Sequence, residues 1–360
     1  MRDTPVTRRR VLAGGAGLAG SLAGCISTSP RPPGQAGGGL GRGGSEGKLL
    51  KSGGSSTVFP IVQRAASYWT SNYKPTDREY WDPGQYGIQT DKRLADYWAG
   101  HYGFEADDDV APPFGVSVGL SHSGTGLEKL ENQQIEIGNA SAPVAAEFPD
   151  RSAEELEPFT NHVVGVDAQP VVVSSEIYEA GVTKLTAEQI RAIYRGEVTK
   201  WSEIPGYSGP DKTIQAVGRS EGSGTDTAFR ANMLGSPDAP MPGVDVRKGQ
   251  NQQVETVVGK SNNAVAYMAL AFVSDATPAV TVEVDGKEYT PGANLGEKSY
   301  PLSRDLHCYT WDGTSKREAA FLRMIVSDFG QQNFVASEGY AKLPGKRQKN
   351  QLDKLPDAQS

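Results

Sequence analysis

The chain reads Leu49-Leu50-Lys51-Ser52-Gly53-Gly54-Ser55-Ser56-Thr57-Val58-Phe59-Pro60 where its folded part begins. Apolar residues then recur at helical spacing at Ile61, Ala65, Tyr68 and Trp69. An apolar start, a run of glycine and hydroxyl residues and an amphipathic stretch predict a strand, a tight turn and a helix in that order.

The same order of strand, small-residue turn and helix occurs twice more. A strand at 116–118 leads into Ser121-His122-Ser123-Gly124-Thr125-Gly126 and a helix around 127–132. A strand at 214–218 leads into Arg219-Ser220-Glu221-Gly222-Ser223-Gly224-Thr225 and a helix at 226–234. Strands that alternate with helices predict an α/β chain with mainly parallel sheets.

Each of these turns is suited to hold an anion. A helix N-terminus exposes unpaired N–H groups and the positive end of the helix dipole. Glycine lets the backbone approach closely, while serine and threonine hydroxyls donate further hydrogen bonds. Three such turns, with Arg219 in the third, predict a small oxyanion site, although helix capping alone could explain any single turn.

The remaining pattern extends the α/β prediction. Further elements are expected as strands at 135–137, 163–174 (a pair), 264–272 and 280–284, and as helices at 91–102, 186–194 and 316–329. Thr186, followed by Glu188 and Gln189, predicts a capped start for the helix at 186–194. No role can be assigned to residues 73–112, whose aromatic residues suggest packing of an inserted segment.

Composition limits the function classes. The chain has 360 residues, of which 37% are hydrophobic, and 43 glycines, so it is globular and long enough for two domains. Its net charge is −7, with an acidic excess after the first 25 residues, which argues against nucleic-acid binding. Two cysteines and four histidines without paired spacing predict neither a disulfide scaffold, a metal site nor a cofactor.

The first 47 residues predict export and anchoring. Arg8-Arg9-Arg10 precede a short apolar run from Val11 to Ala23, which is typical of a twin-arginine signal and too short to span a bilayer. Leu22-Ala23-Gly24-Cys25 resembles a lipobox, so residues 1–25 are expected to be a lipoprotein signal with lipid on Cys25. Residues 26–47 are rich in Ser, Pro and Gly and predict a flexible tether. Cys308 would then be an unpaired, buried residue.

Four motifs together resemble the phosphate-binding proteins of high-affinity phosphate ABC transporters. They are Gly54–Pro60, Ser123–Gly126, Ile193–Trp201 and Arg219–Thr225, supported by Ala264–Tyr267, Tyr300–Arg304 and Gly339-Tyr340. The resemblance covers about residues 49–343. It implies a type II periplasmic-binding-protein fold, with two α/β lobes around a ligand cleft and two crossover strands. We expect one lobe at 48–155 plus 270–350 and the other at 156–269.

The resemblance also implies the residues that bind phosphate. The expected contacts are Ser56, Thr57 and Val58 from the first turn, Ser123 from the second, and Arg219, Ser223, Gly224 and Thr225 from the third. Glu221 matches an acidic position that would orient Arg219.

The sequence departs from the family at one further ligand position, Ser141. Well-known members place an Asp where Ser141 stands, and that Asp accepts a hydrogen bond from protonated phosphate. A carboxylate acceptor rejects sulfate because sulfate has no proton to donate. Ser141 is therefore expected to contact the anion as a neutral donor, with Glu221 or Asp226 as possible replacement acceptors.

These observations predict a receptor rather than an enzyme. It would capture inorganic phosphate outside the cytoplasm, held to the outer face of the membrane by lipid on Cys25 after twin-arginine export, and deliver it as a monomer to ABC permease subunits. A receptor for sulfate, molybdate or tungstate, or a sensing or storage lipoprotein, stays open as an alternative.

A hydrolase built on Ser220 in the pattern Gly218–Gly222, with His307 and Asp312, is a weaker alternative. His122 is expected to be a solvent-facing loop residue, and the sequon at Asn139 is expected to be unused.

Overall fold

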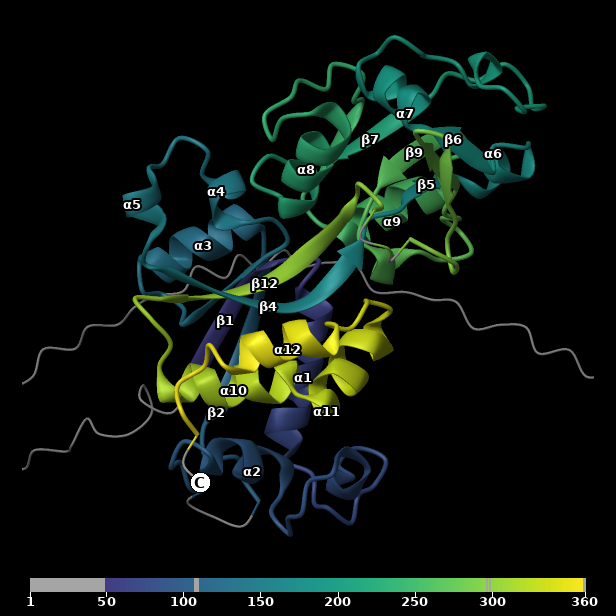
Figure 1. Ribbon diagram of the computed structural model, residues 1–360. Helices are drawn as coiled ribbons and strands as arrows, with labels where there is room; N and C mark the ends of the chain where they lie inside the picture. Colours follow the sequence, from purple (N-terminus) through teal and green to yellow (C-terminus); the bar gives the residue numbers. More distant parts are fainter. Residues whose placement is uncertain (1–48, 107–109, 296, 298, 359–360) are drawn as a thin grey trace, which may run out of the picture. The chain divides into compact units, whose positions relative to one another are not determined.

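The computed structural model describes residues 49–106, 110–295, 297 and 299–358 (Figure 1). All of these belong to one compact unit that extends from Gly44 to Ser360. The predicted signal at 1–25, its Cys25 and the predicted tether at 26–47 lie outside the described residues.

A mixed five-stranded sheet forms the first lobe. Its strand order is β2-β1-β3-β12-β4, with β1 parallel to β2 and β3, and with β12 antiparallel to β3 and β4. The bounds are β1 Leu49–Ser55, β2 Gly115–Ser121, β3 Ile137–Ala140, β4 Phe159–Ala168 and β12 Ser303–Trp311.

Helices cover the first sheet and bury two apolar clusters. The larger cluster includes Trp69 of α1 and Phe321 of α10, and the smaller one contains Leu127 of α3 and Tyr309 of β12. The helical segments of this lobe are α1 Phe59–Ser71, η2 Pro83–Tyr86, α2 Leu94–Gly100, α3 Ser123–Glu131, α4 Val144–Glu147, α5 Ala153–Leu156, α10 Lys316–Val326, α11 Asp328–Gly330, η6 Gln331–Val335, η7 Ala336–Glu338 and α12 Gly345–Leu352.

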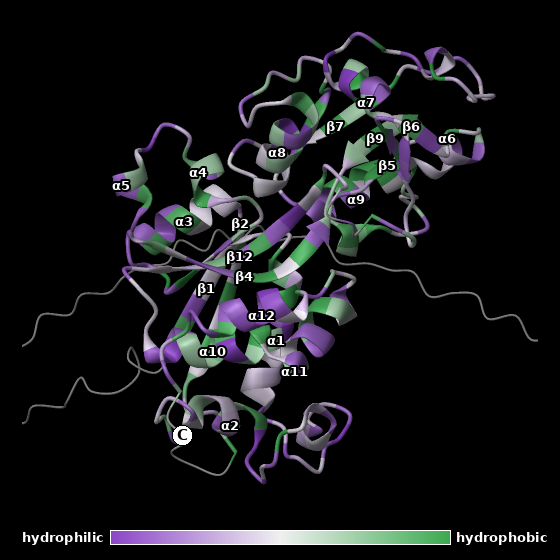
Figure 2. Ribbon diagram, viewed as in Figure 1, coloured by the Kyte–Doolittle hydropathy of each residue, from purple (hydrophilic) through white to green (hydrophobic). Residues whose placement is uncertain are grey.

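Two smaller sheets form the second lobe. One has the order β5-β9-β7-β8 and the other β11-β10-β6. The strands are β5 Val171–Val173, β6 Lys184–Thr186, β7 Gln215–Arg219, β8 Val246–Lys248, β9 Ala264–Tyr267, β10 Thr281–Val284 and β11 Lys287–Tyr289. The helical segments are α6 Ser175–Glu179, α7 Ala187–Tyr194, η3 Trp201–Glu203, α8 Gly224–Phe229, η4 Arg230–Leu234, α9 Asn251–Lys260 and η5 Leu270–Phe272. Figure 2 shows β5 and β9 as mainly hydrophobic and α12 as mainly hydrophilic, which agrees with the burial of every residue of β5 and β9.

The chain passes between the lobes along β4 and β12, which are the two predicted crossover strands. Sheet membership assigns residues 49–168 and 303–358 to the first lobe and 169–302 to the second. These boundaries differ from the predicted 155/156 and 269/270, because β4 pairs with β12 while β10 pairs with β6. The two strands expected within 163–174 are present as β4 and β5, but they pair with β12 and β9 and not with each other.

Most predicted elements are present. The helix expected from Thr186 begins there, and Thr186 and Gln189 form a reciprocal capping box. The aromatic residues of the inserted segment at 73–112 pack inward: Trp81 and Trp98 are buried, and Trp81 lies edge-on to Phe329. Cys308 is buried, as predicted, and burial raises the pKa of its thiol to about 12. Along the described residues, no helix has the length and apolar character needed to cross a bilayer.

Candidate anion-binding site

Three helices begin where strands of the two lobes end. α1 follows β1, α3 follows β2 and α8 follows β7, through the three turns predicted from the sequence. The residues at the N-cap positions are Val58, His122 and Ser223, and none of them makes a side-chain capping hydrogen bond. Side-chain capping therefore does not explain these turns. Two of the first-turn N–H groups donate to the other lobe instead: Gly124 to the Gly222 carbonyl oxygen and Gly224 to Ser123 Oγ.

The turns of the two lobes meet. The hydroxyls of Thr57 and Thr225 are 3.0 Å apart. Ser123 Oγ accepts hydrogen bonds from the backbone N–H of Gly224 and of Ser141, both at 3.2 Å. Most of these side chains are buried, so the expected contacts from all three turns share one region that contains residues of both lobes.

Arg219 brings a positive charge to this region. It is 1% exposed, and its Nη2 donates to Ser56 Oγ at 3.2 Å and to the Gly249 carbonyl oxygen at 2.7 Å. Nε donates to the Lys248 carbonyl oxygen and Nη1 to Asn251 Oδ1. Burial lowers the pKa of Arg219 to about 10, so the guanidinium stays charged at neutral pH.

The predicted role of Glu221 differs from what the structure shows. Glu221 is exposed, and no ion pair between the described residues joins it to Arg219. Backbone carbonyl oxygens and Asn251 orient the guanidinium instead. A motif match could not reveal this, because carbonyl partners leave no signal in side-chain identity.

Asp226 does not act as the replacement acceptor in this structure. Its carboxylate forms an ion pair with Arg230 at 2.7 Å, approaches Arg247 at 3.4 Å and accepts a hydrogen bond from the Tyr267 hydroxyl. Burial raises the pKa of Asp226, while these three groups oppose the rise. The Asp226 carboxylate therefore binds side chains within the second lobe.

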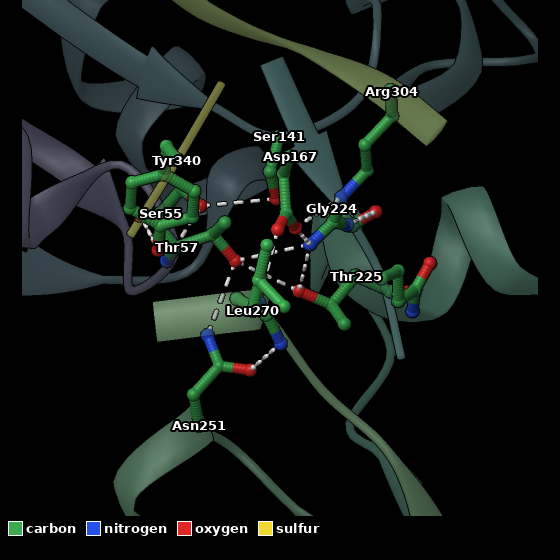
Figure 3. Close-up of polar contacts among 12 residues, drawn as sticks. Ser55, Thr57, Ser141, Asp167, Gly224, Thr225, Asn251, Leu270, Arg304 and Tyr340 are labelled. Atoms are coloured by element: carbon green, nitrogen blue, oxygen red, sulfur yellow. Dashed lines mark hydrogen bonds and ion pairs between the residues drawn. The ribbon is translucent and has the colours of Figure 1, made fainter. Parts of the chain in front are cut away.

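A second arginine, which sequence reasoning missed, lies in the same region. Arg304 Nη2 donates to Thr57 Oγ1 at 3.3 Å and to Thr225 Oγ1 at 3.2 Å, and it forms an ion pair of 2.7 Å with Asp167 (Figure 3). Arg304 was part of a quoted motif, but nothing in that motif indicated that its side chain would reach the turns. Arg219 is therefore not the sole cation of the site.

Asn251, the first residue of α9, also reaches the first turn. Its Nδ2 donates to Ser56 Oγ and to Thr57 Oγ1, both at 3.1 Å. Figure 3 shows Asn251 and Arg304 approaching the Thr57 hydroxyl from different elements. No sequence signal marked Asn251, because its helix was not predicted.

Ser141 lies at the end of β3, fully buried. Its hydroxyl accepts a hydrogen bond from Ser55 Oγ at 3.0 Å. Asn139, which precedes it in the sequon, is buried and donates to Ser52 Oγ at 3.0 Å, so a glycan has no space to attach there.

Glu147 is a carboxylate at this site that sequence reasoning missed. It ends α4, which contacts α3 and α8. Both of its oxygens are buried without a hydrogen-bond partner among the described residues. Burial raises the pKa of this carboxyl to about 8.

The hydrolase alternative is wrong in its geometry. His307 lies on β12 in the first lobe. Its Nδ1 forms a hydrogen bond of 2.9 Å with Asn161 Oδ1, and not with Ser220 or Asp312. His122 is half-buried rather than solvent-facing, and burial lowers the pKa of its ring.

Two α/β lobes, two crossover strands and a polar site between the lobes define the fold of periplasmic solute-binding proteins. The chain belongs to this class: the model of the PBP superfamily domain matches residues 90–328.

Among its relatives, the phosphate-binding protein PstS of Staphylococcus epidermidis strain RP62A is 24% identical over 332 residues, which cover 89% of this chain and 88% of the relative. PstS of Bacillus subtilis strain 168 is 24% identical over 229 residues, covering 64% and 71%. These matches confirm the resemblance inferred from the four motifs.

Solved structures agree in fold. A Clostridium perfringens protein, described as a phosphate ABC transporter substrate-binding protein with bound phosphate, has a TM-score of 0.59 and 23% identity, covering 82% of this chain and 100% of its own. An ABC-type phosphate transport receptor from Vibrio cholerae has a TM-score of 0.53 and 21% identity, with the same coverage.

Proposed function

We propose that this protein captures inorganic phosphate between its lobes and delivers it to an ABC importer. The observation that carries the proposal is the meeting of hydroxyl and N–H donors from both lobes around two buried arginines. Ser56, Thr57 and Ser123 come from the first lobe, whereas Arg219 and Thr225 come from the second. Such donors suit a small, multiply charged oxyanion.

Hinge closure would couple binding to delivery. An anion first held by one lobe would attract the N–H and hydroxyl donors of the other, and the closed form would be stabilised by these added contacts. Permease subunits could then distinguish the closed from the open form. The relatives named phosphate-binding protein support this assignment.

Isothermal titration of the full chain in detergent tests the proposal. We expect phosphate to bind with micromolar or tighter affinity, and sulfate, molybdate and tungstate to bind more weakly. Absence of heat with all four anions would contradict a receptor for tetrahedral oxyanions.

A second function follows from Ser141. With a neutral hydroxyl where well-known relatives have a carboxylate, the site could select sulfate, molybdate or tungstate. Tighter binding of one of these anions than of phosphate in the same titration would favour this function.

We also propose that the chain is exported by the twin-arginine route, anchored by lipid on Cys25 at the outer face of the membrane, and monomeric. The sequence around Arg8, Arg9 and Cys25 supports this. Cys25→Ser should release the protein from membranes, and Arg8→Lys combined with Arg9→Lys should block export. Unchanged membrane fractionation of Cys25→Ser would contradict the anchor. Light scattering of the purified protein tests the monomer.

A further inference from the structure

Three side-chain oxygens converge beside Gly224. A Cβ built at this glycine would lie 2.4 Å from Ser123 Oγ, 2.6 Å from Ser141 Oγ and 2.8 Å from Glu147 Oε1. Glu147 therefore occupies the same small space as two residues expected to contact the anion. Its carboxylate enters from α4, next to the N-terminal turn of α8.

The two hydroxyls in this space have protons to donate. Ser123 Oγ accepts from two backbone N–H groups, and Ser141 Oγ accepts from Ser55. Each serine hydroxyl has a single proton, and these accepted bonds leave that proton unused. Glu147 differs, because an ionised carboxylate only accepts hydrogen bonds.

The carboxylate of Glu147 forms no hydrogen bond with a described residue, although the Gly124 N–H faces it. Both oxygens are buried with no hydrogen-bond partner among the described residues, which is costly for an ionised group. A buried acceptor that forms no hydrogen bond, placed beside two hydroxyl donors, suits a ligand that both accepts and donates hydrogen bonds. A protonated oxyanion is such a ligand.

The charges that face Glu147 oppose one another. Burial is the main cause of its raised pKa, which reaches about 8; the Arg304 cation lowers this pKa, the Asp226 anion raises it, and the Gly124 N–H lowers it. On the α4 side, the Tyr309 hydroxyl accepts a hydrogen bond from the Val144 N–H. Burial raises the pKa of Tyr309 to about 12, so this hydroxyl stays neutral.

We propose that the Glu147 carboxylate accepts the hydrogen bond from the hydroxyl of bound hydrogen phosphate and that, in its ionised form, it makes the site reject sulfate. This inference rests on the proposed oxyanion receptor and names the residue that selects among its ligands. The hydroxyls of Ser123 and Ser141 donate to the unprotonated oxygens, and the P–OH proton stays on phosphate while it is shared with Glu147. Sulfate carries no such proton, so its oxygen would face the carboxylate lone pairs.

The discrimination depends on pH in a defined direction. Below the Glu147 pKa the carboxyl is protonated and can donate to a sulfate oxygen, so both anions bind. Above that pKa, sulfate binding must take up one proton, so its affinity falls about tenfold per pH unit. Hydrogen phosphate supplies its own proton, and its affinity should not fall in this way.

The test compares the full chain, Glu147→Gln and Glu154→Gln by titration calorimetry with phosphate and with sulfate at about pH 6 and about pH 9. Glu154 is an exposed residue of α5 and controls for loss of one negative charge nearby. We expect the wild type and Glu154→Gln to lose sulfate binding at least tenfold between these pH values while they retain phosphate. Glu147→Gln should bind sulfate equally at both, because its amide donates without a titrating proton.

A second measurement needs no variant. Sulfate titrations in buffers of different ionisation enthalpy report proton uptake, which should approach one proton per sulfate at about pH 9 in the wild type. A phosphate-to-sulfate preference that is independent of pH, and unchanged in a folded Glu147→Gln variant, would overturn the role of Glu147 while leaving the receptor intact. No binding of either anion to the wild type would instead overturn the receptor itself.

Discussion

Arg304 and Asp167 form an ion pair across the two crossover strands, with Arg304 Nη2 and Asp167 Oδ2 2.7 Å apart. The two residues are direct partners in the register of β12 and β4. Both side chains are almost fully buried, and Arg304 also reaches the hydroxyls of Thr57 and Thr225. The ion pair thus connects the junction of the lobes with the turns of both lobes.

Removing Asp167 should destabilise the fold. In Asp167→Ala the buried Arg304 loses its counter-charge, and we expect the free energy of unfolding to fall by about 3 kcal/mol. Urea unfolding followed by circular dichroism measures this change. Asp211→Ala, which breaks an exposed pair with Lys200, is the control and should have little effect. Equal effects of the two variants would refute the structural importance of the buried pair.

Arg219→Ala should weaken phosphate binding by about 100-fold, because truncating a buried, hydrogen-bonded charge costs about 3 kcal/mol. Some affinity should remain, since Arg304 supplies a second cation. Titration calorimetry measures the loss, with the exposed Arg78→Ala as the control for a change in net charge. Retention of wild-type affinity by Arg219→Ala would place the anion elsewhere.

Gly224→Ala should act as a wedge between the lobes. The added methyl would lie 2.4 Å from Ser123 Oγ and 2.6 Å from Ser141 Oγ when the turns of the two lobes meet as they do in this structure. We expect affinity for phosphate to fall at least tenfold, an energy of about 1.4 kcal/mol or more, while the melting temperature without ligand stays near that of the wild type. Gly345→Ala is the matched control, because a Cβ there meets no atom within 4 Å. A Gly224→Ala protein that binds normally would show that the turns need not approach this closely.

His162 should make the fold sensitive to acid. Burial lowers the pKa of this histidine to about 4 from its ordinary value of 6.5. Its contribution to stability is therefore complete above about pH 6.5 and is lost as the pH falls toward 4, because the unfolded chain binds the proton first. As the pH falls over that range, the free energy of unfolding of the wild type should decrease by about 2–3 kcal/mol more than that of His162→Gln.

Urea unfolding at several pH values measures this difference. Because carboxylates titrate in the same range, only the difference between the two proteins reports on His162. Parallel pH profiles for the variant and the wild type would mean that the His162 ring has the same pKa in the folded and the unfolded chain.

The sequence located the candidate residues in the three turns better than those whose position depends on strand pairing or helix packing. Glycine and hydroxyl residues before a helix are local signals, so the turns at Ser56, Ser123 and Ser223 could be located without a structure. Arg304 and Glu147 could not, because their side chains enter from elements whose position depends on sheet pairing and helix packing. Glu221 was misassigned because carbonyl oxygens, which every residue has, replaced the acidic partner.

The predicted lobe boundaries differ from those given by sheet membership for a related reason. Residues 281–289 look like any pair of short strands, and only their pairing with β6 assigns them to the second lobe. Conversely, the apolar run at 163–174 is continuous in sequence but is divided between two sheets.

The position of β12 determines when the first lobe can mature during synthesis. This strand lies between β3 and β4, yet it is made last, after the whole second lobe at residues 169–302. Since β4 has β12 as its sheet neighbour, a nascent chain that stops short of Trp311 carries an unpaired strand edge and an open apolar face. The second lobe is continuous and can form first, whereas the first lobe waits for long-range pairing, which is slow and exposed to aggregation. The half of the binding site on the second lobe therefore folds before the half on the first lobe, although its residues come later in the chain. The complete site forms only when β12 has joined the first sheet.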